Sequence, residues 1–279
     1  MGNCCGSPAA AAAEQGRDNV RRKKAERLAN WKATHVIALR KADLAELPPE
    51  VAQVPSPRVL DASDNRLERV PPLAPSLQRL VLSNNRLAGM AGMEALRNLK
   101  VLALDGNRIA TLPDWVGELS RLETLSLGDN QLAALPPSLG RLQRLRQLLV
   151  PQNRLRALPA ALGECAALEE LDAHHNVIEE VPPQLGRLRR LKLLQLDGNL
   201  VAAVPPEVLH GCTALATLSL HDNPISPDAL AATDGFAAYE ARRQGKYTKT
   251  LAGGALLGKN GMDEGLDRHG VSPRRGATA

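Results

Sequence analysis

The chain has 279 residues, of which 44% are hydrophobic and only 2% aromatic, and its formal net charge is +5. This length suits one elongated array with flanking segments, and the low aromatic content disfavours a core built on bulky rings. We expect no secretory signal and no membrane-spanning helix, because the sequence has no apolar run approaching roughly 18 residues.

Residues 1–13 read Met-Gly-Asn-Cys-Cys-Gly-Ser-Pro followed by five alanines, and we interpret them as a disordered lipid-anchor signal. Gly2 behind the initiator Met is typical of N-myristoylation, although Gly6 replaces the preferred hydroxyl residue. Cys4 and Cys5 are then candidates for S-palmitoylation, because a single myristoyl chain binds membranes only marginally. The alternative is an unmodified, disordered N-terminus.

Residues 14–33 lack proline and contain many helix formers, which predicts a basic N-terminal helix. Its cations would attract anionic lipid, or alternatively form a nuclear signal. These cations are Arg17, Arg21, Arg22, Lys23, Lys24 and Arg27. We expect Leu28 and Trp31 to cover the first repeat, because the ends of a stacked array need caps.

Residues 34–226 contain about nine copies of the pattern L-x-x-L-x-L-x-x-N-x-L, seen clearly at Leu122–Leu132. The L-x-L part alternates apolar and polar residues, which predicts a short strand with one buried face. Stacked copies would bury that face, and each asparagine would satisfy backbone groups of its own turn and of the next repeat. Five of the asparagines are spaced 23 residues apart: Asn107, Asn130, Asn153, Asn176 and Asn199.

A Leu-Pro or Val-Pro step and then L-G-x-L follow the asparagine in most repeats, which predicts a short helix or 3-10 turn there. Two places depart from the pattern. Ala42 replaces the first asparagine, and Asn65 and Asn85 are only 20 residues apart. Because the region 89–92 also lacks the proline step, we expect irregular loops around it.

The repeat resembles the leucine-rich repeat family, whose units are about 20–29 residues long, over roughly residues 34–230. The resemblance implies an α/β solenoid of horseshoe shape, with a parallel sheet on the concave side and short helices or 3-10 turns on the convex side. The segments Ile37–Pro48 and Gly235–Glu240 are similar to small intracellular members. The L-P-x-x-L-G-x-L type resembles members that work with small GTPases.

A capping helix is predicted over residues 227–244, with Leu230, Phe236 and Tyr239 closing the open end of the leucine core. Residues 245–279 are rich in Gly, Lys and Arg and have few apolar anchors, which is typical of a disordered tail.

The polar positions around the strand leucines should face the concave side, where a protein partner would bind. They are mostly acidic, with apolar residues among them, and such an arrangement is typical of a protein interface. The predicted partner-binding residues are Asp61, Asp105, Asp129, Leu149, Glu170, Asp172, His174, Leu193, Asp197 and His221. An acidic face favours a basic or amphipathic protein and repels nucleic acid. The alternative is that these are merely solvated strand positions.

Catalytic and cofactor sites have weak support. His174, Asp197 and His221 recur in one column and could ligate a metal, but polar residues commonly fill such a column. The segment 253–259 imitates a phosphate loop, yet Asn260 replaces the required Ser/Thr and no strand precedes it. We predict no enzyme activity, no metal and no cofactor.

The predicted function is that of a non-catalytic, monomeric adaptor in intracellular signalling. Lipid at Gly2, Cys4 and Cys5 would tether it to the cytoplasmic face of a membrane, with a cytoplasmic pool. Only Cys165 and Cys212 lie in the repeats, and the absence of paired capping cysteines favours a reducing compartment. The alternative is a soluble regulatory subunit of an enzyme, in a phosphatase or small-GTPase pathway.

Overall fold

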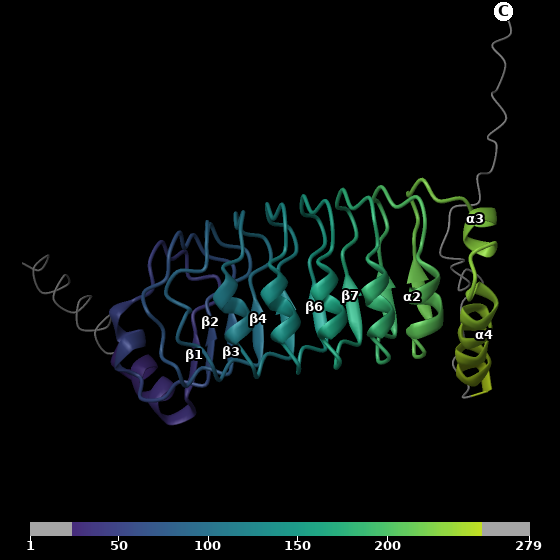
Figure 1. Ribbon diagram of the computed structural model, residues 1–279. Helices are drawn as coiled ribbons and strands as arrows, with labels where there is room; N and C mark the ends of the chain where they lie inside the picture. Colours follow the sequence, from purple (N-terminus) through teal and green to yellow (C-terminus); the bar gives the residue numbers. More distant parts are fainter. Residues whose placement is uncertain (1–23, 253–279) are drawn as a thin grey trace, which may run out of the picture.

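The computed structural model describes residues 24–252, with side chains for residues 24–245. Nine strands form one sheet in chain order, and every neighbouring pair is parallel (Figure 1). The strands are β1 Val36–Ala38, β2 Val59–Asp61, β3 Arg79–Val81, β4 Val101–Ala103, β5 Thr124–Ser126, β6 Gln147–Leu149, β7 Glu170–Asp172, β8 Leu193–Gln195 and β9 Thr217–Ser219. The predicted sheet of stacked repeats is confirmed.

The middle residue of each strand points into the core, and these residues lie in register. Leu125 pairs with Leu148, Leu148 with Leu171, and Leu171 with Leu194, and all four are fully buried. Each leucine therefore packs between the leucines of neighbouring strands, about 4.8 Å away on either side. One continuous hydrophobic core runs along the stack because every repeat supplies an apolar residue at the same place, Ile37 in β1 and leucine in the other eight strands.

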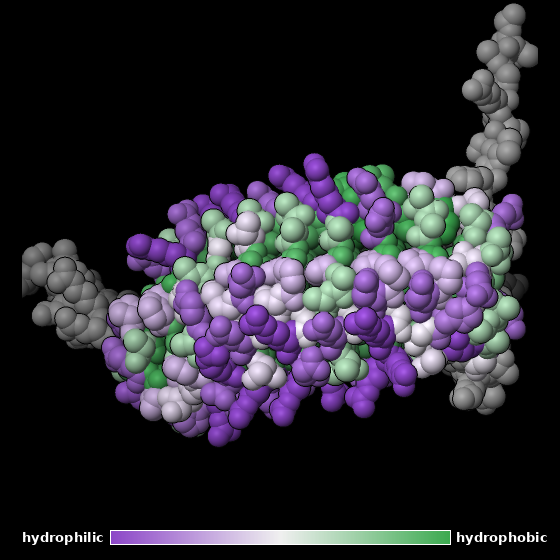
Figure 2. Space-filling view, in the orientation of Figure 1, coloured by the Kyte–Doolittle hydropathy of each residue, from purple (hydrophilic) through white to green (hydrophobic). Residues whose placement is uncertain are grey.

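Short turns form the convex side of the solenoid, opposite the concave sheet. Five are 3-10 turns and the sixth is a helix: η1 Pro49–Gln53, η2 Asp114–Glu118, η3 Pro137–Arg141, η4 Ala160–Glu164, η5 Pro183–Arg187 and α2 Pro206–Gly211. Each follows a proline that is extended, which sets the direction of entry. The view that shows these turns in front (Figure 1) is hydrophilic over most of its surface, with hydrophobic side chains gathered along the upper edge (Figure 2).

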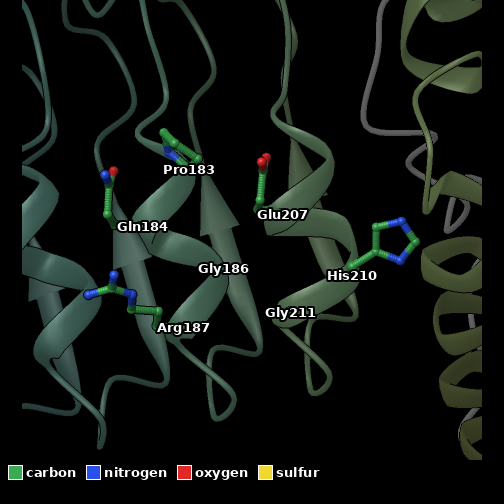
Figure 3. Close-up of a pocket in the computed structure, with 7 residues that line it drawn as sticks. All are labelled: Pro183, Gln184, Gly186, Arg187, Glu207, His210 and Gly211. Atoms are coloured by element: carbon green, nitrogen blue, oxygen red, sulfur yellow. The ribbon is translucent and has the colours of Figure 1, made fainter.

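Neighbouring turns touch through their backbones, and the glycine of L-G-x-L permits this. A Cβ atom on Gly163 would lie 2.2 Å from the carbonyl oxygen of Gln184 in the next turn. At Gly211 of α2 it would lie 2.0 Å from the carbonyl oxygen of Gly186 in η5, and Figure 3 shows these two segments side by side. A side chain at these positions would force the turns apart, so glycine sets the spacing on the convex side.

The turn pattern is interrupted near the N-terminal end, as the sequence predicts. Neither a helix nor a 3-10 turn occurs between β2 and β4, a stretch that is described throughout. Leu60 and Leu80 pair in register although the repeat between them has only 20 residues. The irregular loops expected here are therefore confirmed.

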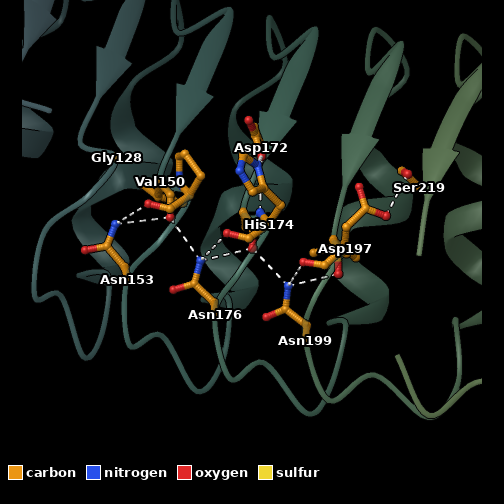
Figure 4. Close-up of polar contacts among 12 residues, drawn as sticks. Gly128, Val150, Asn153, Asp172, His174, Asn176, Asp197, Asn199 and Ser219 are labelled. Atoms are coloured by element: carbon orange, nitrogen blue, oxygen red, sulfur yellow. Dashed lines mark hydrogen bonds and ion pairs between the residues drawn. The ribbon is translucent and has the colours of Figure 1, made fainter. Parts of the chain in front are cut away.

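A ladder of asparagine side chains joins the repeats where the strands end (Figure 4). Asn130 Nδ2 donates to the carbonyl oxygens of Leu127 and Gly128 in its own turn and of Leu104 in the preceding repeat. Its Oδ1 accepts from the amide of Ile109, also in the preceding repeat, at 3.0 Å. The prediction of bonds to the next repeat was wrong in direction, because the amide points back along the stack.

A helix over residues 24–34 covers the N-terminal end. Trp31 is buried and Leu28 is half-buried against the core, which confirms their predicted capping role. The Arg27 guanidinium lies 4.9 Å from the Trp31 ring. The rest of the predicted helix, residues 14–23, and the lipid-anchor signal of residues 1–13 lie outside the described residues.

The C-terminal cap differs from the single helix predicted over residues 227–244. It consists of α3 Pro227–Ala231 and α4 Phe236–Ala252, separated by Gly235 with φ of 87°. The α3 helix ends at Ala231 and residues 232–235 join it to α4, where the left-handed backbone of Gly235 favours glycine. The start of the tail at residue 245 was also wrong, because α4 has no proline to stop it and continues to Ala252. Residues 253–279 lie outside the described residues.

The predicted plug of the core is confirmed within this cap. Leu230 and Tyr239 are buried, and Phe236 is half-buried against the same core. The Tyr239 hydroxyl accepts a hydrogen bond from the Leu218 amide at 3.1 Å. The cap therefore both covers the last leucines and satisfies a backbone donor at the edge of the sheet.

Candidate binding surface on the concave sheet

Three rows of side chains face outward along the concave sheet. Row 1 is the first strand residue: Val36, Val59, Arg79, Val101, Thr124, Gln147, Glu170, Leu193 and Thr217. Row 2 is the third strand residue: Ala38, Asp61, Val81, Ala103, Ser126, Leu149, Asp172, Gln195 and Ser219. Row 3, two residues further on, is Arg40, Ser63, Ser83, Asp105, Gly128, Pro151, His174, Asp197 and His221. Burial alternates along the strands from β1 to β8, so these rows face away from the core, and in β9 Ser219 is buried as well.

Strands β6, β7 and β8 bring four of the predicted partner-binding residues together. The register places Leu149 beside Asp172 and Glu170 beside Leu193, and all four are half-buried. The three strands span about 10 Å, so one partner side chain could reach all of them. We call these four residues the acidic-apolar cluster.

The two carboxylates of the cluster are held in place by hydrogen bonds. Asp172 Oδ1 lies 2.6 Å from His174 Nδ1 and accepts from the His174 amide at 3.1 Å. Glu170 Oε2 accepts from Gln147 Nε2 at 2.8 Å, and Gln147 Oε1 in turn accepts from the Thr124 hydroxyl at 3.0 Å. A carboxylate offers about four acceptor sites, so each retains capacity for a partner while its direction is fixed.

Asp105 and Asp197 fasten one repeat to the next. Asp105 Oδ1 accepts from the Ser126 hydroxyl at 2.5 Å and from the Gly128 amide at 2.8 Å. Asp197 Oδ1 accepts from the Ser219 hydroxyl and the His221 amide, both at 2.7 Å. These two predicted partner-binding residues therefore have a structural role as well, which the repeat pattern does not reveal.

Three predicted residues lie apart from the cluster. Asp61 is in β2, about 24 Å from β7 at the usual strand spacing. Asp129 does not lie on a strand: it is exposed at a left-handed turn residue with φ of 50°, just before Asn130. Its assignment to the strand face was wrong because the chain has already turned off the sheet there. His221 follows β9, at the C-terminal end of row 3.

The N-terminal end of the surface is neutralised by pairing. Arg40 Nε donates to Asp64 Oδ2 at 2.8 Å, and Asn84 Nδ2 donates to Asp64 Oδ1 at 2.7 Å. The hydrogen bond from Asn84 and then that from Arg40 hold the pKa of Asp64 below its usual value. The acidic character predicted for the concave side therefore lies mainly toward β6–β9.

Two exposed apolar residues in the repeats of β7 and β8 were missed by the sequence reasoning. Val177 and Leu200 each follow the ladder asparagine of their repeat and are exposed. In four other repeats this position is basic, at Arg66, Arg86, Arg108 and Arg154. Comparing this one position across the repeats would have found them, because the change from basic to apolar occurs only toward the C-terminal end.

A convex hollow with a volume of about 490 Å³ lies between η5 and α2. Its polar side chains, Gln184, Arg187, Glu207 and His210, point in different directions (Figure 3). His210 Nε2 lies 3.0 Å from Asp234 Oδ2, outside the hollow. A reaction needs groups that converge on one point, and this hollow does not provide them.

The column weighed as a metal site is occupied by internal hydrogen bonds. His174 bonds to Asp172, and Asp197 bonds to the next repeat. Within the described part of the chain, no three His, Cys, Asp or Glu side chains are arranged to hold a metal ion.

The two cysteines of the repeats are unsuited to nucleophilic chemistry. Burial raises the pKa of the Cys165 thiol to about 12 and that of Cys212 to about 11. Each thiol donates to a backbone carbonyl, Cys165 to Leu139 at 3.2 Å and Cys212 to Leu185 at 3.1 Å. A reactive cysteine needs an accessible thiolate, and these are buried and protonated.

Comparison with known families agrees with this fold. Residues 83–176 match the family model described as a leucine-rich repeat region. Two rice (Oryza sativa subsp. japonica) proteins are similar in sequence. Plant intracellular Ras-group-related LRR protein 7 is 43% identical over 60 residues, which are 22% of this chain and 23% of the relative. Plant intracellular Ras-group-related LRR protein 8 is 38% identical over 110 residues, which are 37% of this chain and 28% of the relative. The chain thus matches about a quarter of each relative's length.

Solved structures show the same architecture. A leucine-rich-repeat protein of Leptospira interrogans is 32% identical with a TM-score of 0.63, covering 66% of this chain and 48% of that one. An internalin of Listeria monocytogenes has a TM-score of 0.65 at 20% identity, covering 77% of this chain and 61% of that one. The fold is therefore a leucine-rich-repeat solenoid, which supports a role in protein interaction. None of the helices in the described residues is long and apolar enough to cross a membrane.

Proposed function

We propose that this protein is a non-catalytic adaptor in intracellular signalling, which binds a basic or amphipathic protein on its concave sheet and is tethered to a membrane by lipid. The observation that carries the binding role is the acidic-apolar cluster on β6–β8. It offers two half-buried leucines beside two oriented carboxylates on a rigid surface. A preorganised surface loses little conformational entropy when a partner binds.

The charge of the cluster determines the kind of partner. Glu170 and Asp172 lie on one strand with no cation in rows 1 and 2 of β6 or β8. Lys or Arg side chains of a partner would gain favourable charge pairing there, and an apolar residue between them would pack on Leu149 and Leu193. Electrostatic attraction of this kind mainly raises the association rate and is reduced by salt.

A double substitution tests this surface. Glu170→Lys with Asp172→Lys should lower the capture of the partner at least tenfold, because it replaces attraction with repulsion. Glu164→Lys, an exposed position on η4 at the convex side, is the matched control and should leave capture unchanged. Proteins captured from cells by affinity purification are compared by quantitative mass spectrometry, with circular dichroism to check folding. Equal loss in the control, or no loss in the double variant, would reject the concave site.

The tether rests on residues 1–13 and the basic segment that follows. One acyl chain at Gly2 binds membranes marginally, and acylation of Cys4 or Cys5 or the nearby cations would supply the second signal. Mass spectrometry of the N-terminal peptide measures the modification directly. Gly2→Ala should move most of the protein from the membrane fraction to the soluble fraction.

The intracellular location and the signalling context are supported by the names of the two rice relatives, intracellular Ras-group-related proteins. The second candidate is a soluble regulatory subunit of an enzyme in a phosphatase or small-GTPase pathway. It uses the same acidic-apolar cluster but needs no lipid. Wild-type protein that carries no fatty acid, with the partner still captured through the cluster, would favour this second function.

A further inference from the structure

The first two repeats enclose an apolar cavity of about 290 Å³ on the convex side. All thirteen residues that line it are Ile, Leu, Val, Pro or Ala. Ile37, Leu60 and Leu77 of its lining belong to the fully buried core, whereas Val51 and Ala74 are half-buried and Ala52 is exposed. The cavity therefore extends from the core toward the surface. A lining without polar side chains suits a hydrocarbon and excludes sugars, nucleotides and metal ions.

The cavity exists because the convex turns are interrupted at this place. In η2 to η5 the middle residue is fully buried, at Val116, Leu139, Leu162 and Leu185. Val51 has the same place in η1 but stays partly exposed, because the next repeat offers no turn to pack on it. Ala52 likewise stands where η3 to η5 have glycine, since no neighbouring backbone approaches.

Such a cavity is unusual in a closely packed interior. Protein cores contain few voids larger than a water molecule, and an empty apolar void costs stability. Apolar cavities also stay dry and accept apolar ligands. At about 290 Å³ this one is close to the lower limit of ligand pockets, which is roughly 300 Å³. A second hollow lined by Glu46, Leu47, Arg69, Val70 and Pro71 shares two of its walls and lies outside it.

The N-terminal segment of this chain starts beside the cavity wall. The Lys24 ammonium pairs with Glu50, and Glu50 belongs to η1, whose Pro49 and Val51 line the cavity. Gly2 precedes Lys24 by 22 residues, a length that spans up to about 70 Å when extended. A segment of this length is long enough for an acyl chain on Gly2 to reach the cavity, and covalent attachment would give it a high effective concentration there.

We propose that this cavity holds the fatty acyl chain of Gly2 when the protein is detached from the membrane. This inference rests on the proposed lipidation of Gly2. The acyl chain enters the cavity past Leu47 and Val51 and packs against Leu60 and Leu77, while the Gly2 amide stays at the surface. The membrane and the cavity then compete for one acyl chain, so membrane binding is weaker than that of a freely exposed chain.

The cavity itself is tested on the unlipidated full chain, with N-acylglycines of 8 to 16 carbons as probes and titration calorimetry as the assay. Affinity should rise about fourfold for each added methylene and then level off at the length that fills the cavity. Ala74→Leu should weaken binding at least tenfold and raise the thermal midpoint of the empty protein, because the leucine fills the void. Ala95 is exposed in the next convex loop. Ala95→Leu is therefore the matched control and should change neither the binding affinity nor the thermal midpoint.

Ala52→Phe is the second variant, because this residue is exposed and its replacement does not threaten folding. The phenylalanine should block the entrance of the cavity and weaken binding of the N-acylglycines. Absence of saturable binding, an affinity that rises without a plateau, or equal binding by wild type and both filled variants would overturn the cavity as an acyl site.

The occupant is tested on chain that mass spectrometry shows to be myristoylated. Lipidated wild type should bind N-myristoylglycine at least tenfold more weakly than unlipidated chain, because its own acyl chain fills the cavity. Lipidated Ala74→Leu should sediment with neutral phosphatidylcholine vesicles more than lipidated wild type. Equal N-myristoylglycine binding by lipidated and unlipidated chain, or a free fatty acid co-purifying with Gly2→Ala protein, would overturn the assignment to Gly2. If Gly2 is never acylated in cells, the proposed tether fails, while the calorimetric series still decides the cavity.

Discussion

The asparagine ladder gives a quantitative test of what holds the repeats together. Asn130→Ala removes four hydrogen bonds at once: three donated by Nδ2 and one accepted by Oδ1. All three carbonyl acceptors keep another partner, because Leu104 also accepts from Asn107, Leu127 from Asn153, and Gly128 from the Gly106 amide. The Ile109 amide loses the hydrogen bond that it donates to Asn130 Oδ1.

The expected cost follows from this inventory. A buried donor left without its partner costs about 1–3 kcal/mol, and each lost bond whose acceptor keeps a partner adds up to about 1 kcal/mol. We therefore expect the free energy of unfolding to fall by about 3 kcal/mol in Asn130→Ala. Gln131→Ala changes the exposed neighbouring residue and should stay within about 0.5 kcal/mol of wild type.

Urea denaturation followed by circular dichroism measures these differences. Asn130→Asp adds a second comparison. Its carboxylate can still accept from the Ile109 amide, but it has no N–H group to donate to the three carbonyl oxygens. Burial beside those oxygens raises the pKa of an acid in the fold, so its destabilisation should be largest at neutral pH and smaller as the pH falls toward about 4. A loss below 1 kcal/mol in Asn130→Ala, or one equal to that of Gln131→Ala, would refute the reasoning.

Three further substitutions or measurements test separate features. Gly163→Ala places a Cβ atom 2.2 Å from a carbonyl oxygen of the next turn and should lower the thermal midpoint by several degrees, whereas Gly89→Ala, with open space around it, should not. Tyr239→Phe removes the acceptor of the Leu218 amide and should cost about 1–3 kcal/mol, with faster hydrogen exchange of that amide. Because burial raises the pKa of Cys165 from 9.0 to about 12, its contribution to stability is complete below pH 9 and is lost as the pH rises from 9 to 12. Iodoacetamide at pH 9 should therefore alkylate this thiol much more slowly in folded than in urea-unfolded protein, and equal rates would contradict its burial.

The repeat itself could be predicted from the sequence because its forces are local and recur. A leucine at the centre of each strand must be buried wherever the pattern stacks, so the row through Leu125, Leu148 and Leu194 followed from spacing alone. The same holds for Trp31 and Tyr239, since an apolar side chain just outside the array has one exposed core end to cover.

The acidic-apolar cluster could be predicted only in part. The sequence placed Glu170, Asp172, Leu149 and Leu193 on the outward face, but the selection of β6–β8 as the place where they meet required the strand register. Likewise, Asp105 and Asp172 are both acidic residues that the sequence predicts on the concave face. Asp105, however, joins its repeat to the next one by accepting hydrogen bonds from Ser126 and Gly128. Hydrogen bonds between repeats depend on relative positions that residue type does not encode.

The sequence by itself determined the architecture, because periodic leucines and asparagines specify burial and turning at each repeat. The tertiary structure alone decided three things: the backward direction of the asparagine bonds, the break in the C-terminal cap at Gly235, and the apolar cavity behind η1. The asparagine bonds recur at regular junctions between repeats, whereas the cap and the cavity arise where the repeat pattern ends or is interrupted. A pattern describes the repeat, whereas the fit between unequal neighbours is settled only when they pack in space.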